Sequence, residues 1–200
     1  MTRQQRAEQT RHRLIDAAAA EFGAHGYAGT TLQRVARAAG VTMGALTFHF
    51  PSKSALAEAV QQAGAEATRA LLRSALEGSG LAEVLGGTLA LAQALDSTPS
   101  MRAAARLARE GHRGSQDWYA SWVPQLRAGL ERVWPEQRPG TGLSAAAVTA
   151  LLGYLLIGVE ATAASGGAPP LAVAREPQDA LGQLTQALLA LTAGGDGGRP

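Results

Sequence analysis

A short segment from Thr42 to Lys53 holds the residues best suited to contact a polyanion. It begins with Thr42-Met43-Gly44-Ala45 and ends near His49 and Lys53, the only lysine among 200 residues. A threonine hydroxyl can cap the start of a helix, where free N–H groups point outward and attract phosphate. Gly44 and Ala45 have almost no side chain and allow a close approach. The imidazole and the ammonium can each donate to a phosphate oxygen.

Predicted helices must position this segment. Apolar residues recur every three or four positions over 10–25, 32–39 and 43–49, with Thr10 as the expected cap of the first helix and Gly26 as its stop. Thr30 and Thr31 are both candidate caps of the second helix, and Gly40 supplies the left-handed backbone of a sharp turn before the third. This pattern indicates a helix-turn-helix, with an unrelated pair of packed helices as the alternative. In a helix-turn-helix the second helix lies in the DNA major groove.

The charge distribution supports a polyanion at the N-terminal end. Residues 1–53 carry seven Lys or Arg against three acids, a net charge of +4, whereas the remainder carries −2. A basic segment joined to a larger, slightly acidic one suggests that the first meets a polyanion and the second meets something else. The chain contains no cysteine, and it opens without a secretion signal, so a reducing cytoplasm is expected.

The rest of the chain also predicts helices, and the expected fold class is therefore all-α. No run of strand length alternates apolar and polar residues. A fourth helix should follow Ser52, which can cap it, and reach Leu76. Further helices are expected over 81–95, 100–111, 115–134, 144–164 and 177–191, and the Gly-rich tail 194–200 is expected to have no fixed structure.

Residues 143–159 form an uncharged run that could be mistaken for a membrane span. The run has 17 residues, at the short limit for a span, and no Lys/Arg cluster sits beside either end. We interpret it as a buried helix, with no membrane partner. Its small residues would let another helix approach closely, so it is our candidate for a subunit interface, through Leu152, Leu156 and Val159. An ordinary helix of the chain's own core is the alternative.

The first sixty residues resemble the TetR family of bacterial transcriptional regulators. The residues that carry the resemblance are Phe22-Gly23-Ala24-His25-Gly26-Tyr27, Thr30-Thr31, Val35-Ala36, Ala39-Gly40-Val41-Thr42, Gly44-Ala45-Leu46, Phe48-His49-Phe50 and Ser52-Lys53. Residues 6–11, with 44–46 and 48–50, resemble the γ-butyrolactone receptor subfamily in particular. A looser resemblance to that subfamily's effector domain involves Tyr119, Trp122 and residues 157–160.

The resemblance implies a DNA-binding domain over 1–53 and an effector-binding and dimerisation domain over 54–193. Such a protein would bind a pseudo-palindromic operator on double-stranded DNA as a homodimer, usually as a repressor. A small molecule would release it: a γ-butyrolactone-like signal, or an antibiotic or biosynthetic intermediate. No cofactor or metal is expected. The expected DNA contacts are Arg3, Arg6, Thr31, Thr42, Met43, Gly44, Ala45, Thr47, Phe48, His49 and Lys53. For Arg3 and Arg6 a solvated basic arm is the alternative.

Two positions depart from the family pattern. Family members commonly carry Lys where this chain has Met43 and Tyr where it has Thr47, and both of those residues reach DNA phosphates. Fewer phosphate contacts would lower the salt-sensitive part of the affinity. Met43 and Thr47 can still make apolar contact with a thymine methyl group.

A cluster of aromatic residues marks the expected effector site. Trp118, Tyr119 and Trp122 lie on one predicted helix in a chain that holds only nine Phe, Trp and Tyr residues. Large flat side chains that can also donate hydrogen bonds suit an enclosed, mostly apolar cavity, although packing in the core is the alternative. The resemblance places an effector-contacting tryptophan nearest Trp122. Further candidates for the cavity wall are Met101, Leu107, Val148 and Leu152.

No catalytic machinery is visible in the sequence. The four histidines have no metal-ligand spacing, and neither a Gly-rich phosphate loop with Lys nor a G-x-S-x-G elbow occurs. A small all-helical enzyme is therefore a weak alternative to a regulator. A DNA-binding protein without an effector is a second alternative, against which the long aromatic-bearing C-terminal part argues.

Overall fold

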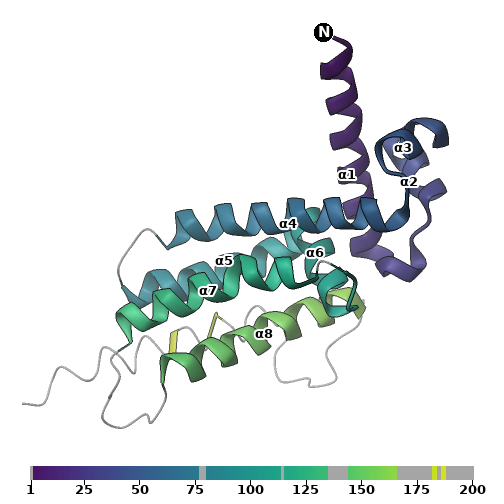
Figure 1. Ribbon diagram of the computed structural model, residues 1–200. Coiled ribbons are helices and arrows are strands. Elements are labelled where there is room, and N and C mark those ends of the chain that lie inside the picture. The colour runs from purple at the N-terminus through teal and green to yellow at the C-terminus, as the bar shows by residue number, and fades with distance from the viewer. Residues whose placement is uncertain are drawn as a thin grey trace, which may run out of the picture. The chain divides into compact units, whose positions relative to one another are not determined.

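The computed structural model (Figure 1) describes residues 2–76, 80–113, 115–134, 144–165, 182–183 and 186–187. These residues form helices joined by turns and bends, without a strand, which confirms the expected fold class. Only 182–183 and 186–187 of the helix expected over 177–191 are described, and both pairs are helical; the tail 194–200 lies outside the described residues. The helices are α1 (Arg3–Gly29), α2 (Leu32–Ala39), α3 (Met43–His49), α4 (Lys53–Ala75), α5 (Leu81–Ser97), α6 (Pro99–Arg109), α7 (Ser115–Val133) and α8 (Ala145–Ser165).

Helix α1 begins seven residues before the predicted start, which is a correction. Thr2, not Thr10, caps it: the Thr2 hydroxyl accepts the Gln5 N–H at 3.2 Å, and the Gln5 side chain accepts the Thr2 N–H at 2.8 Å. This reciprocal pair satisfies two N–H groups that a helix end leaves free. Thr10 lies inside the helix, where its Oγ1 donates to the Arg6 carbonyl oxygen at 2.9 Å.

The expected stop at Gly26 is present as a break inside α1. Gly26 has φ 69° and ψ −180°, so the regular helix ends there and a short additional turn continues to Gly29. Only glycine adopts this backbone region readily. The buried Thr30 then donates from Oγ1 to the Gly26 carbonyl oxygen at 2.8 Å, which closes the turn.

Helices α2 and α3 occupy the predicted ranges and carry the predicted caps. The Thr31 hydroxyl accepts the Arg34 N–H at 3.3 Å, and the Thr42 hydroxyl accepts the Ala45 N–H at 3.2 Å. Gly40 ends α2 in the left-handed region at φ 63°, and the Val41 N–H bonds back to the Ala36 carbonyl oxygen at 3.0 Å. The capped turn fixes the angle between the two helices, as a helix-turn-helix requires.

The chain separates into two compact units, of which the first is Met1–Arg69 with Ala94–Ser121. In this unit α6 packs along α1, and α2 packs against both α1 and α3. The predicted division of function after Lys53 stays a prediction, although α6 belongs to the same compact unit as the N-terminal helices. The core of this unit consists of Leu14, Ile15, Ala18, Ala19, Phe22, Val35, Ala36, Ala39, Leu46, Phe50, Leu56, Ala57, Val60, Ala103 and Leu107.

The second unit combines Ala70–Gln93 with Trp122–Pro200. Glycines permit close packing between its helices: the position of a Cβ at Gly153 would lie 3.3 Å from the Trp122 ring. By length and composition α8 could cross a membrane over Ala145–Thr162. However, Val148, Leu152, Leu156 and Val159 are buried, which confirms the expected buried helix for this face of α8.

Candidate nucleic-acid interface

Helix α3 separates a buried face from an exposed one. Leu46 and Phe50 are 0% and 3% exposed and join the core of the first unit, so they hold α3 against α1 and α2. Thr42, Met43 and Gly44 are exposed, and Ala45 is half-buried. The first turn of α3 is therefore accessible to a partner, and it carries only small side chains apart from Met43.

Phe48 is the most exposed large apolar side chain in the described residues. It is 82% exposed on α3, and its ring lies edge-on to His49, with centroids 5.2 Å apart. A single exposed ring is common on folded surfaces, so Phe48 points to a partner only together with the accessible first turn of the same helix. His49 is half-buried beside it, at the end of α3.

The Thr47 side chain turns its polar group toward its own helix. Its Oγ1 donates toward the carbonyl oxygens of Met43 at 3.0 Å and Gly44 at 3.2 Å. The residue is exposed, and the bonded hydroxyl leaves its methyl group as the part suited to an apolar contact. This geometry favours the predicted contact with a thymine methyl group over a phosphate contact.

Lys53 has a role that the sequence did not indicate. Its ammonium donates to the carbonyl oxygens of Tyr27 at 2.7 Å and Thr30 at 2.9 Å, and it lies 4.2 Å from the centre of the Tyr27 ring. Two of its three N–H donors therefore hold the turn between α1 and α2 to the start of α4. Its predicted phosphate contact stays a prediction, and one donor is left for it.

The basic residues near the N-terminus divide into two groups. Arg3 and Arg6 are exposed on the first turns of α1, so in this structure they belong to a helix and not to an extended arm. Arg13 Nη2 donates to the Ala39 carbonyl oxygen at 2.6 Å, and the Arg11 guanidinium lies 5.4 Å from the centre of the Phe50 ring. These last two cations brace the helix-turn-helix against α1.

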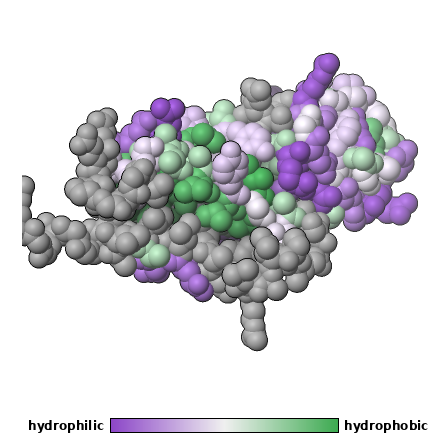
Figure 2. Space-filling view, turned by 90° about the horizontal axis from the view of Figure 1, so that it is seen from below, coloured by the Kyte–Doolittle hydropathy of each residue, from purple (hydrophilic) through white to green (hydrophobic). Residues whose placement is uncertain are grey.

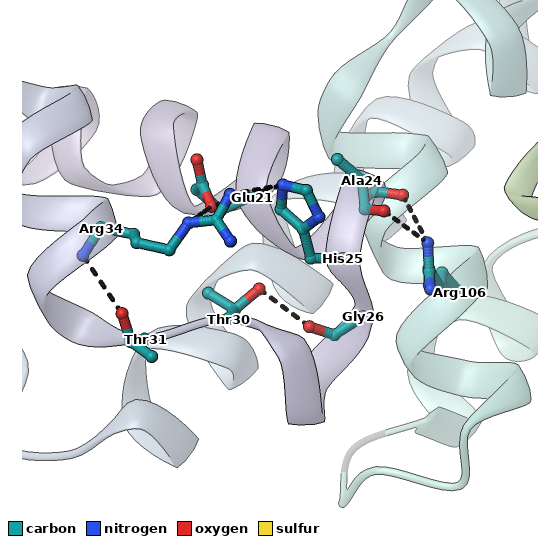
Figure 3. A network of polar contacts seen from close by, with 9 residues as sticks. Glu21, Ala24, His25, Gly26, Thr30, Thr31, Arg34 and Arg106 are labelled. Atoms are coloured by element: carbon teal, nitrogen blue, oxygen red, sulfur yellow. Dashed lines mark hydrogen bonds and ion pairs between the residues drawn. The ribbon is translucent and has the colours of Figure 1, made fainter.

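Sequence inspection missed a polar network that fastens α2 to α1 (Figure 3). The Arg34 guanidinium pairs with Glu21, with Nε and Oε2 3.0 Å apart, and its Nη2 lies 2.6 Å from His25 Nε2. The opposite charges of Glu21 and Arg34 are the only sequence feature that hints at this ion pair. Their separation of 13 residues does not predict a contact until the angle between α1 and α2 is known. Arg37, also on α2, is exposed and adds a cation beside the turn.

The predicted effector-site residues are buried, apart from the half-buried Tyr119. In the first unit, Met101, Leu107 and Trp118 are 4%, 0% and 1% exposed, and the Trp118 and Tyr119 rings meet edge-on with centroids 5.1 Å apart. Leu107 is part of the first unit's core. In the second unit, Trp122, Val148 and Leu152 are each 2% exposed or less, which fits the interior of a helical domain as well as a cavity wall.

The predicted interface residues on α8 are also buried within one subunit. Leu152, Leu156 and Val159 are 1%, 0% and 7% exposed, so they pack in the second unit's own interior. The opposite face exposes Leu151 at 50% and Tyr154 at 74%. Apolar side chains gather on the side of the molecule where α8 lies (Figure 2). The exposed residues of this face are Ala146, Ala150, Leu151, Tyr154 and Gly158.

Residues 14–60 match the family model described as bacterial regulatory proteins, tetR family. The chain is 35% identical over 147 residues to the A-factor receptor protein of Streptomyces griseus, which covers 70% of this chain and 51% of that protein. It is 50% identical over 54 residues to the HTH-type transcriptional regulator SrpR of Pseudomonas putida, over 27% of this chain and 25% of that protein. The chain thus spans about half the length of the first relative and a quarter of the second.

Solved structures share the fold over a greater length. A γ-butyrolactone receptor described as an ArpA-like protein matches with a TM-score of 0.66 and 28% identity, over 91% of this chain and 99% of that one. The TetR family protein CprB from Streptomyces coelicolor, solved in complex with its operator sequence, matches with a TM-score of 0.64 and 28% identity over the same shares. Residues 14–60, which include the capped helix-turn-helix, thus match the tetR family of bacterial regulatory proteins, and the likeness to a solved γ-butyrolactone receptor continues through nine tenths of the chain.

Proposed function

We propose that this protein is a transcriptional regulator, not an enzyme, that binds a pseudo-palindromic DNA operator as a homodimer and releases it when a small molecule binds. The observation that carries the proposal is the exposed face of α3, with small residues in its first turn and Phe48 standing 82% exposed beside them. The DNA major groove suits this surface, because it is wide and deep enough to admit an α-helix and a recognition helix enters it through its N-terminal residues.

The contacts we propose divide into base and phosphate contacts. Met43, Thr47 and Phe48 offer apolar atoms for thymine methyl groups, and Gly44 allows the backbone of α3 to approach the base edges. Phosphates would meet the first turn of α3 and exposed cations such as Arg37. Thr31, Thr42 and His49, with Arg3 and Arg6 on α1, complete the proposed surface.

We propose that the exposed face of α8 pairs the subunits. Two recognition helices must lie about 34–36 Å apart, or a multiple of that distance, to enter successive major grooves. A stable pairing surface is needed to hold that spacing. On the exposed face of α8, Ala146, Ala150, Tyr154 and Gly158 follow one another every four residues, and the exposed Leu151 lies beside this row, so the face offers apolar surface to a second copy of α8. A cytoplasmic location beside the chromosome follows from this function.

The effector is proposed to be γ-butyrolactone-like, or an antibiotic or biosynthetic intermediate. The similarity to the A-factor receptor protein and to structures described as γ-butyrolactone receptors supports this class. Trp122 is the residue proposed to contact it. A ligand that prefers a different spacing of the two recognition helices lowers operator affinity by its differential binding to the two states, which is the action of an inducer.

Selection of DNA from a random-sequence pool tests the proposal. The wild-type protein is expected to enrich a two-fold symmetric site, and Phe48→Ala is expected to weaken binding to that site. Gln62→Ala, an exposed change on α4 in the same unit, is the matched control and should bind as the wild type does. Failure of the wild type to enrich any sequence contradicts the proposal.

The effector assignment has its own test. A γ-butyrolactone that binds should raise the melting temperature of the wild type and release the selected DNA. Trp122→Ala should keep DNA binding and lose the release. If Trp122 is only a core residue, truncation costs about 3–5 kcal/mol and both activities fall together. A Trp122→Ala protein that folds, binds and is released normally removes Trp122 from the site.

A further inference from the structure

The backbone between α1 and α2 is held by charged side chains from other helices. The break at Gly26 interrupts the hydrogen bonds of α1, and residues 27–31 then lead directly into the Thr31 cap of α2. We call residues 23–31 the α1 corner. A corner of this kind leaves peptide groups that need partners from elsewhere.

Two side chains of the α6 end supply partners on one side of the α1 corner. The Arg106 guanidinium donates from Nη1 to the carbonyl oxygens of Gly23 and Ala24, each at 3.0 Å (Figure 3). The Glu110 carboxylate accepts the Tyr27 N–H at 2.8 Å through Oε2, and it accepts Arg106 Nε at 3.0 Å through Oε1. One ion pair therefore bonds to three peptide groups of the corner.

The fit between Gly26 and Glu110 is close. A Cβ on residue 26 would collide with the Glu110 carboxylate, so the carboxylate occupies the space that glycine leaves open. On α4, Lys53 bonds to the Tyr27 and Thr30 carbonyl oxygens of the same corner. Glycine is thus required at residue 26 by its φ of 69°, and a larger residue there would also displace the Glu110 carboxylate from the corner.

We infer that Arg106 and Glu110 are positioning residues for DNA binding. They fix the conformation of the α1 corner, and the corner in turn fixes the angle at which α2 and α3 are held. The inference rests on the proposed operator binding. The corner is the covalent entry to α2. Besides the Thr30–Gly26 hydrogen bond inside the corner, the hydrogen bonds that fix it come from Arg106 on α6, Glu110 at the end of α6 and Lys53 on α4. Without Glu110, the Tyr27 N–H and the Arg106 Nε lose their acceptor, and the corner samples other conformations. Operator affinity then falls in proportion to the fraction of molecules that keep the binding geometry.

The direction in which operator affinity changes when Glu110 is removed distinguishes a positioning role from a simple change of net charge. Removing a negative charge from a DNA-binding protein ordinarily strengthens its binding to DNA. Glu110→Ala is expected to weaken operator binding about tenfold, the size of one lost hydrogen bond to a charged group. Its binding to non-specific DNA should be unchanged or slightly stronger.

The matched control is Glu131→Ala on α7. Glu131 pairs with Arg127 at 2.7 Å, with the same four-residue spacing as Glu110 and Arg106. Both side chains of this pair are largely exposed. The substitution removes the same charge from the chain, and operator affinity should stay that of the wild type. Glu110→Gln keeps a carbonyl oxygen for the Tyr27 N–H and is expected to bind within about threefold of the wild type.

The measurement is titration of the wild type and each variant with the selected operator and with a scrambled duplex, well below the melting temperature of each protein. Under those conditions a variant that is merely less stable is still folded and binds normally. A folded Glu110→Ala protein with wild-type or tighter operator binding overturns the inference, as does a Glu110→Gln protein as weak as Glu110→Ala. If the wild type itself selects no operator, that result contradicts the proposed function, whereas a result confined to the Glu110 variants contradicts this inference alone.

Discussion

At the scale of single residues, Met43 is the position in α3, the proposed recognition helix, whose departure from the usual family pattern has the clearest physical consequence. It is 36% exposed at the first position of α3, so a longer cation placed there can reach a phosphate. Met43→Lys should tighten binding to all DNA at low salt and steepen the salt dependence by about one unit, because one more phosphate is neutralised.

Thr47→Tyr provides the uncharged comparison for that experiment. It adds a phenolic hydroxyl on the same exposed surface, so it should raise affinity without changing the salt slope. Fluorescence titrations across a series of salt concentrations measure both quantities. A Met43→Lys protein with an unaltered slope would place residue 43 away from the phosphates.

Lys53 is expected to contribute to stability before it contributes to DNA binding. Its ammonium bonds to two carbonyl oxygens in a partly buried place, so Lys53→Ala should lower the free energy of unfolding by about 1.5–3 kcal/mol. Denaturant unfolding measures this loss. If Lys53 also touches a phosphate, the salt slope of DNA binding flattens by about one unit in the folded variant; a change in preference among operators at constant slope contradicts that contact.

At the scale of helices, α8 shows how a uniformly apolar sequence conceals which face is buried. Leu156 is fully buried and Tyr154, two residues earlier, is 74% exposed, yet the sequence pattern pointed to Leu156, and not to Tyr154, as an interface residue. Tyr154→Glu should give folded monomers, because it charges only the exposed face. Leu156→Glu should unfold the chain, because it places a charge in the interior. Light scattering and circular dichroism distinguish the two results, and a dimeric Tyr154→Glu protein would remove this face of α8 from the interface.

Local sequence patterns predicted most of the helices, but not the side-chain hydrogen bonds that join helices distant in the sequence. Thr31, Gly40 and Thr42 determine α2, α3 and the turn between them within a few residues, and these predictions are confirmed. The start of α1 was misplaced because Thr10 offers the same hydroxyl as Thr2, and only the reciprocal bond with Gln5 distinguishes the true cap. The partners of Glu110 and Lys53 lie 83 and 26 residues away, beyond any periodic pattern.

At the scale of the whole molecule, His112 is expected to make stability depend on pH. Its ring stacks on Tyr27 with centroids 4.3 Å apart, and its Nε2 is buried without a hydrogen-bond partner among the described residues. Burial lowers the pKa of His112 below its usual value of 6.5; Lys53 adds to this shift, and Glu58 and Glu110 oppose it. Below that usual value the unfolded chain binds the proton more readily than the folded chain does.

His112 should therefore leave the free energy of unfolding undiminished above about pH 7. That free energy should decrease as the pH falls from there through the folded-state pKa of His112. His112→Gln should make the decrease shallower. His12→Gln, an exposed change on α1, should leave it unaltered and serves as the control. Urea unfolding at a series of pH values tests this, and equal slopes for the wild type and His112→Gln would exclude His112 as the source.

The position of the only lysine has a practical consequence for observing this molecule in solution. A protease that cuts after lysine has a single site in the entire sequence, and that site lies where Lys53 is tied to the turn between α1 and α2. Cleavage requires the local structure to open, so its rate reports the free energy of opening at this one place. The rate at which the two fragments form would then measure how firmly α2 and α3 are held, with and without DNA, and no label would have to be introduced.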